Sequence, residues 1–116
     1  MLIVDDHPGF RRSARRLLAA EGFDVLGEAV DGQSAVALVR RLRPQVVLLD
    51  VLLPDTDGFV VAELLAGEPF SPCVVLTSSR DASDFASRLA RTTARGFLPK
   101  AELSGAKLAA FTEVTL

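Results

Sequence analysis

Acidic residues end two apolar runs of this chain. The run Leu2–Val4 is followed by Asp5 and Asp6, and the run Val46–Leu49 is followed by Asp50. Strand ends at one edge of an open parallel sheet are where α/β folds place their sites. Three carboxylates that converge there are electrostatically costly unless a cation lies among them. The pattern therefore predicts a Mg²⁺ site, because Mg²⁺ prefers oxygen ligands and is commonly held by one or two carboxylates.

Two further polar side chains are expected at the same edge. Thr77 follows the apolar run Cys73–Leu76, and Lys100 comes shortly after the run Gly96–Leu98. Each residue alone has an ordinary explanation, since threonine is common in strands and a lysine after a strand is usually a surface charge. Their joint placement with the three carboxylates is what indicates a functional site.

The elements that must position these residues alternate between strand and helix. Short apolar runs predict strands over residues 2–4, 23–29, 46–49, 73–76 and 96–98. Apolar stripes at helical spacing predict helices that start at Pro8 and end before Gly22, and that cover 33–42, 59–66, 81–93 and 103–111. Asp81 or Ser83 is available to cap the fourth helix.

Alternating strands and helices predict an α/β protein with a parallel sheet. Right-handed crossovers limit the possible topologies. The doubly wound, flavodoxin-like order 2-1-3-4-5 places the first and third strands side by side at a switch point. That order would bring Asp5, Asp6 and Asp50 together and deliver Thr77 and Lys100 to the same edge.

Composition bounds the class of protein. The 116 residues suit one domain, and a hydrophobic fraction of 49% is typical of a globular chain. No apolar stretch approaches the roughly 20 residues of a membrane helix, and no secretory signal begins the chain. The one cysteine, Cys73, fits a reducing, cytoplasmic location. A net charge of −2 gives no indication of nucleic-acid binding, and the clustered arginines are interpreted as exposed helix faces.

Taken together, these motifs make the chain resemble the receiver domain of two-component response regulators over essentially its whole length. The likeness is carried by residues 2–8, 47–54 with Gly58, 75–77 and 96–100. His7 and Pro8 are similar to the receivers that are attached to LuxR/NarL-like helix-turn-helix outputs. The resemblance implies one receiver domain over 1–116, with no output domain present in this chain.

The resemblance also implies how such a domain works. Asp50 would accept a phosphoryl group from a phosphohistidine of a partner sensor histidine kinase. Mg²⁺ would be held by Asp5, Asp6, Asp50 and the backbone carbonyl of Val51, and would offset the repulsion between two anions. Lys100 would pair with phosphate oxygens.

The expected switch involves Thr77 and Phe97. Thr77 would hydrogen-bond to the phosphate, and Phe97 would rotate inward and remodel the face formed by the fourth helix, fifth strand and last helix. That face would control an output, with transcription as the expected process, and could also form a homodimer on phosphorylation. The domain itself is expected to bind neither a membrane nor nucleic acid, and not to be an enzyme.

Three alternatives remain. An aspartyl-phosphate phosphatase would carry a second acid two residues after the nucleophile, where this chain has Leu52. A degenerate receiver would bind partners without phosphorylation, against which the intact site residues argue. A dinucleotide-binding domain would need a glycine-rich loop after its first strand. His7 is favoured as a helix-start residue over a metal ligand or phosphate carrier.

Overall fold

The computed structural model describes residues 1–112 and contains one five-stranded sheet. The strands are β1 (Leu2–Val4), β2 (Gly27–Ala29), β3 (Val46–Asp50), β4 (Cys73–Ser78) and β5 (Gly96–Pro99). All neighbours are parallel, and the order is β2-β1-β3-β4-β5. The predicted fold class and strand order are confirmed.

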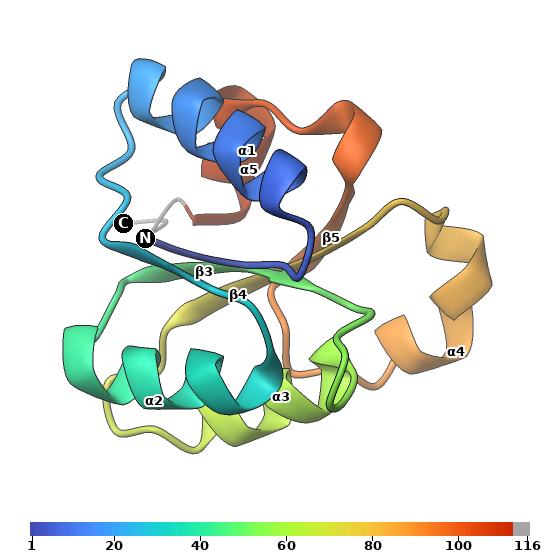
Figure 1. Ribbon diagram of the computed structural model, residues 1–116. Coiled ribbons are helices and arrows are strands. Elements are labelled where there is room, and N and C mark those ends of the chain that lie inside the picture. Colours follow the sequence, from blue (N-terminus) through green and yellow to red (C-terminus); the bar gives the residue numbers. More distant parts are fainter. Residues whose placement is uncertain (113–116) are drawn as a thin grey trace.

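Helices cover both faces of the sheet. They are α1 (Pro8–Ala20), α2 (Gly32–Leu42), α3 (Gly58–Ala66), α4 (Ala86–Leu89) and α5 (Gly105–Thr112), with 3-10 turns η1 (Ala82–Phe85) and η2 (Lys100–Glu102). Figure 1 shows α1 and α5 on one face, α2 and α3 on the other, and α4 beside the edge formed by β5. None of the described helices is both long and apolar enough to cross a membrane.

The core is divided into two layers because successive strand side chains point to opposite faces. Leu2 and Val4 lie in the layer beneath α2 and α3, and Ile3 lies in the layer beneath α1 and α5. All three are fully buried, as expected for a strand that is covered on both sides. This burial fixes the carboxyl end of β1, from which the first two acids emerge.

The second strand is shorter than the predicted 23–29. Gly22 has a φ of 98°, the left-handed conformation that ends α1. Phe23 N–H then returns to the Leu18 carbonyl at 2.9 Å, so this residue closes the helix instead of joining the sheet. Phe23 and Val25 still pack against the core beneath α1, which explains their apolar character. Apolar residues that serve a loop cannot be distinguished from strand residues by pattern alone.

The fourth helix is present but much shorter than the predicted 81–93. The structure has the 3-10 turn η1 followed by the single helical turn α4. Asp81 makes no side-chain cap, and Thr92 Oγ1 instead accepts the Ala94 N–H at 3.1 Å. Side chains of this kind compete with helical hydrogen bonds. Phe85 and Leu89 nevertheless face the core, as expected.

The last helix starts two residues later than predicted. Ser104 Oγ accepts the Lys107 N–H at 3.1 Å, which marks Ser104 as the cap of α5. Residues 100–102 form η2 between β5 and this cap. The remaining boundaries differ by one or two residues, and β4 extends through Thr77 and Ser78.

Candidate functional site

The acids that follow β1 and β3 meet at the carboxyl edge of the sheet. The strands pair in register, with Val4 beside Leu49 and Asp50 beside Thr77. Asp5 is fully buried and Asp50 is 3% exposed, whereas Asp6 lies at the surface. The predicted convergence of the acids and Thr77 is therefore present.

Lys100 reaches the two buried carboxylates from the start of η2. Its Nζ lies 2.6 Å from Asp5 Oδ2 and 3.3 Å from Asp50 Oδ2. Burial works against the charge of Lys100, but the contacts with Asp5 and Asp50 prevail and raise its pKa above the ordinary value. The ammonium also lies 4.5 Å from the centre of the Phe10 ring, so an aromatic face of α1 supports it. The lysine thus enters the site as a permanent cation.

The Asp50 carboxyl has a raised pKa. Burial is the main cause, the nearby Asp5 adds to it, and together they raise the pKa of Asp50 to about 6. Lys100 and the Leu52 N–H, which donates to Asp50 Oδ1 at 3.2 Å, oppose this rise. A second positive charge in the cleft would favour the ionised form that a nucleophile needs.

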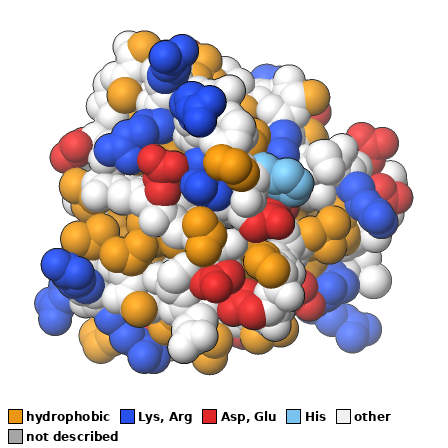
Figure 2. Space-filling view, viewed as in Figure 1, with side chains coloured by type: hydrophobic (Ala, Val, Ile, Leu, Met, Phe, Trp, Pro, Cys, Tyr) orange, Lys and Arg blue, Asp and Glu red, His pale blue; other side chains and the backbone are white. Residues whose placement is uncertain are grey.

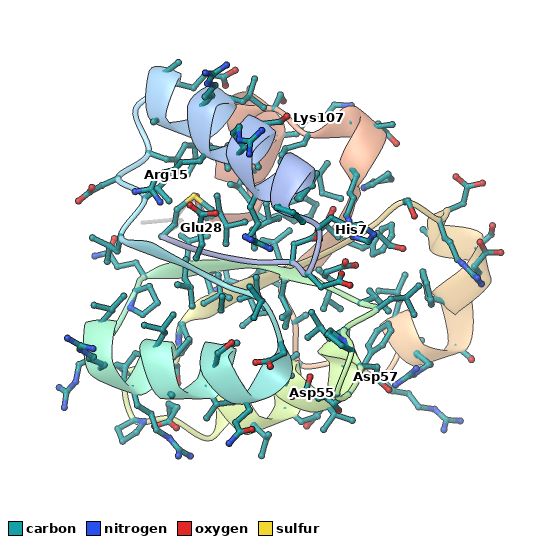
Figure 3. The ribbon with its side chains drawn as sticks, viewed as in Figure 1. His7, Arg15, Glu28, Asp55, Asp57 and Lys107 are labelled. Atoms are coloured by element: carbon teal, nitrogen blue, oxygen red, sulfur yellow. The ribbon has the colours of Figure 1, made fainter. Side chains whose placement is uncertain are left out.

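Arg11 positions the first acid, a role that the sequence analysis missed by assigning the arginines to exposed faces. Its guanidinium donates to the Asp5 carbonyl at 2.7 Å and pairs with Glu28 at 3.2 Å, and its side chain is 17% exposed. Arg15 pairs with the same glutamate at 2.8 Å, and Figure 3 shows Arg15 and Glu28 next to each other. The sequence did carry a signal for this role. Arg11 and Arg15 are four residues apart on one helix face, and Glu28 of the edge strand lies opposite them.

The loop after β3 is shaped by close backbone contacts. Gly58 N–H donates to the Val51 carbonyl at 2.7 Å, and a Cβ at Gly58 would collide with the Asp50 carbonyl oxygen. Leu52 pairs with Asp57 in an antiparallel bridge. Glycine is therefore required at 58 to bring α3 against the backbone of Asp50.

His7 lies at the mouth of the cluster. It occupies the N-cap position of α1, which matches the predicted helix-start role, but its side chain makes no capping hydrogen bond. The ring Nδ1 instead lies 3.1 Å from Asp5 Oδ1 and 3.1 Å from Asp6 Oδ1. Figure 2 shows the imidazole of the chain's single histidine at the surface beside acidic side chains.

Thr77 is fully buried, and its hydroxyl donates to the Leu98 carbonyl of β5 at 2.6 Å. The proton of Thr77 is therefore committed to β5 and not to Asp50. One residue before Leu98 in β5, the Phe97 ring packs on Phe85 with centroids 5.9 Å apart, and Phe85 contacts Phe59 at 6.0 Å. The two expected switch residues thus touch the same strand, and one of them leads by aromatic contacts to α3.

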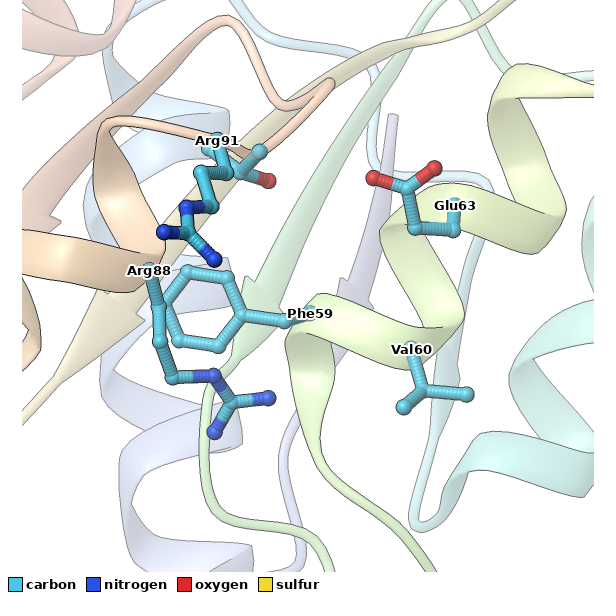
Figure 4. A pocket seen from close by; sticks show the side chains of 6 residues that line it. Phe59, Val60, Glu63, Arg88 and Arg91 are labelled. Carbon is cyan, nitrogen blue, oxygen red and sulfur yellow. The ribbon is translucent and has the colours of Figure 1, made fainter.

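An ion pair connects α4 to the start of α3. Arg88 pairs with Asp57 at 2.8 Å and lies 4.3 Å from the centre of the Phe59 ring. A pocket of about 310 Å³ opens between these helices, and Figure 4 shows Arg88 and Arg91 on either side of the Phe59 ring. Burial opposes ionisation of Asp57, but Arg88 and the capped N–H of Val60 lower its pKa. None of the residues that line this pocket belongs to the acidic cluster.

The acidic cluster fits a divalent cation. Ligand atoms of Asp5, Asp6, His7 and Asp50 all lie within 4.8 Å of one another. Asp5 Oδ2 is buried without a well-directed hydrogen bond, and Lys100 Nζ lies 2.6 Å from it as its counter-charge. A cluster of carboxylate oxygens, one of which is the buried Asp5 Oδ2, suits a hard cation such as Mg²⁺.

Known proteins identify the family. A family model described as "Response regulator receiver domain" matches residues 1–111, so the chain belongs to the response regulator receiver family. It is 36% identical over 102 residues to a provisionally named transcriptional regulator of Pseudomonas aeruginosa, covering 88% of this chain and 49% of that protein. It is 33% identical over 101 residues to the DNA-binding transcriptional activator EvgA of Escherichia coli K12, covering 87% and 50%.

The fold agrees with solved receivers. The signal receiver domain of NarL from Mycobacterium tuberculosis superposes with a TM-score of 0.85 at 33% identity, over 97% of this chain and 95% of that one. The chain spans about half the length of the first curated relatives it matches. The general function of the family is that of a phosphorylation switch in two-component signalling.

Proposed function

We propose that this domain is switched by phosphorylation of Asp50, with Mg²⁺ as its cofactor. The carrying observation is the contact of buried Asp50 with Lys100 at 3.3 Å beside the buried Asp5. A buried carboxylate that is flanked by a lysine and a second acid is suited to attack an electrophile when a cation shares the cleft. The raised pKa of Asp50 indicates that Lys100 and the Leu52 N–H do not fully stabilise its negative charge, so a bound cation would stabilise it further.

We assign the cation to the carboxylates of Asp5, Asp6 and Asp50. The Val51 carbonyl, expected as a further ligand, points to Gly58 N–H at 2.7 Å. Leu52 has an extended backbone in its bridge with Asp57, and its N–H is directed at Asp50 Oδ1. In an extended residue the N–H and carbonyl point to the same side. We therefore propose the Leu52 carbonyl in place of the Val51 carbonyl as the main-chain ligand.

The proposed reaction is an in-line transfer. An Asp50 carboxylate oxygen attacks the phosphorus of a phosphohistidine on a sensor kinase, the new O–P bond forms, and the N–P bond breaks with the electron pair left on the imidazole. Mg²⁺, when bound, reduces the repulsion between the two anions. Lys100 is already in contact with Asp50 and supplies a cation to the arriving oxygens.

The proposed switch starts from the hydrogen bond between Thr77 and Leu98. A phosphoryl group on Asp50 offers acceptor oxygens to the neighbouring Thr77 hydroxyl. Thr77 then breaks its hydrogen bond to the Leu98 carbonyl and moves toward the phosphoryl group. The Phe97 ring leaves Phe85 and rotates into the space that Thr77 has vacated. The face built by α4, β5 and α5 changes as a result and is read by an output domain or by a second copy of the chain.

Phosphoryl uptake from a small donor tests the proposal. The parent chain, incubated with acetyl phosphate and Mg²⁺, is expected to gain one phosphoryl group in its intact mass, and chelation of the metal should abolish the gain. Asp50→Asn should gain nothing. Asp55→Asn is the matched control, because Asp55 is an exposed acid of the same loop that binds the first N–H groups of α2. Equal labelling of the parent and Asp50→Asn would refute the assignment.

A further inference from the structure

We infer that His7 is a nitrogen ligand of the cation site, which therefore binds Co²⁺ and similar transition metals in preference to Mg²⁺. The inference rests on the proposed function, since it concerns the same cleft. A site of carboxylates and carbonyls alone favours hard cations, whereas an imidazole nitrogen suits the later divalent metals of the first transition row. The identity of one side chain thus decides which metal the cleft prefers.

The position of Nδ1 fits a shared coordination sphere. Two ligand atoms at right angles around an ion, each about 2.1 Å from it, lie about 3.0 Å apart. The His7 Nδ1 lies 3.1 Å from Asp5 Oδ1 and 3.1 Å from Asp6 Oδ1. These two distances match adjacent edges of an octahedron, so one ion can contact the nitrogen and a carboxylate on each side without moving the backbone.

The ring is available for this role. His7 is held against the cluster by its backbone N–H, which donates to Asp5 Oδ1 at 2.8 Å. Its side chain does not cap α1 and is 69% exposed, and in the metal-free cleft the ring is placed by a hydrogen bond between Nδ1 and Asp5 Oδ1 at 3.1 Å. The other oxygen of this acid, Asp5 Oδ2, is buried without a well-directed hydrogen bond and has Lys100 Nζ 2.6 Å away as its counter-charge. An ion between His7 Nδ1 and Asp5 Oδ1 would replace their hydrogen bond and use both atoms as ligands.

Calorimetric titration of the 116-residue chain with Co²⁺ and with Mg²⁺ at one fixed pH tests the inference. His7→Phe keeps a ring without nitrogen, and His7→Asn keeps a polar side chain that is favourable at an N-cap. Both variants should lose Co²⁺ affinity by about tenfold or more while Mg²⁺ affinity changes by less than about threefold. Arg12→Gln, on the same helix but outside the cluster, should change neither affinity.

A spectroscopic measurement reports ligation directly. The chain has one histidine, so its two imidazole ¹⁵N resonances are unambiguous. Zn²⁺ should shift the Nδ1 resonance strongly while Nε2 keeps its proton. If both cations bind the parent, but the variants keep the parent's affinity ratio and Zn²⁺ leaves the Nδ1 resonance of the parent unshifted, the inference is overturned and the phosphorylation site stands. If neither cation binds the parent, the inference and the metal assignment of the proposed function both fail.

Discussion

Lys100 Nζ lies 2.6 Å from Asp5 Oδ2, closer than to Asp50, the acid proposed to carry the phosphoryl group. In this state the lysine compensates the deepest carboxylate of the cleft, whose side chain is fully buried. A cation bound by Asp5 would take over that task and leave Lys100 free for Asp50 and for whatever Asp50 binds. Because Lys100 is closer to Asp5 than to Asp50, metal binding at Asp5 would make the lysine available to Asp50.

Removal of the lysine should destabilise the metal-free protein. Lys100→Met leaves two buried acids without their cation, and we expect the free energy of unfolding to fall by about 3 kcal/mol. Addition of Mg²⁺ should recover most of the loss. Urea unfolding with and without Mg²⁺ measures both effects.

Lys107→Met is the control for that experiment. Lys107 pairs with Glu102 at 3.1 Å, but both side chains are more than half exposed, and such pairs contribute about 0–1 kcal/mol. Equal losses in the two variants, or a loss at Lys100 that Mg²⁺ does not reverse, would show that Lys100 does not act by compensating the acids.

The raised pKa of Asp50 predicts a specific pH dependence of stability. The pKa is about 6 in the folded chain against 3.8 for the free side chain, so the folded state binds more protons between these values. Stability therefore falls as pH rises through this window, and the penalty is complete above about pH 6. The shift of about two units corresponds to at most about 3 kcal/mol.

Asp50→Asn should remove this penalty. At pH 7.5 without metal, the variant is expected to be more stable than the parent by about 1–3 kcal/mol, and the difference should vanish near pH 4. Saturating Mg²⁺ should also reduce it, because the cation stabilises the ionised parent. Thermal or urea unfolding across pH 4–8 measures the difference; a parent that is the more stable protein at pH 7.5 without metal would contradict the account.

The hydrogen bond from Thr77 to Leu98 gives a further prediction. Thr77→Val keeps the shape of the side chain but leaves the Leu98 carbonyl without this donor, at a cost of about 1–2 kcal/mol. Thr77→Ser keeps the hydroxyl and should retain that part of the stability. Phosphoryl uptake should persist in Thr77→Val, while the change in Phe97 resonances on phosphorylation should be reduced. If the Phe97 resonances change by the same amount on phosphorylation in the parent and in Thr77→Val, Thr77 has no part in the switch.

The ion pair between Arg88 and Asp57 should couple α4 to α3. Asp57→Asn retains an N-cap for α3, so the charge can be removed without removal of the cap. In a double-mutant cycle with Arg88→Met we expect a coupling energy of about 0.5–1 kcal/mol. Arg91→Met, on the other side of the same pocket, is the comparison and should be additive with Asp57→Asn.

Much of the fold and of the site was predictable from the sequence because both depend on strong local signals. Continuous apolar runs predicted the strands, except that residues 23–26 of the second one form a loop, and polar residues at the carboxyl ends predicted which side chains meet there. The fourth helix does not extend to the predicted residue 93, where Thr92 and Thr93 use their hydroxyls on the backbone, at Ala94 N–H and the Ala62 carbonyl. Such competition depends on tertiary partners that spacing does not reveal.

The details of the cleft required coordinates for the same reason. The contact of Arg11 with the Asp5 carbonyl depends on where α1 lies relative to the carboxyl end of β1. The direction of the Val51 carbonyl is set by Gly58, seven residues away. The His7 ring, expected to serve the helix start, turns instead to the carboxylates. Helix position and peptide orientation, rather than residue type, decide these three contacts.

The central claim is that Asp50, among several adjacent acids, carries the phosphoryl group. Reduction of the acetyl phosphate-treated chain with borohydride converts an acyl phosphate to an alcohol, so peptide mass spectrometry then locates the modified residue as homoserine. The account predicts homoserine at position 50 and aspartate at 5, 6 and 55. Homoserine at any of those three positions, with aspartate retained at 50, would contradict it.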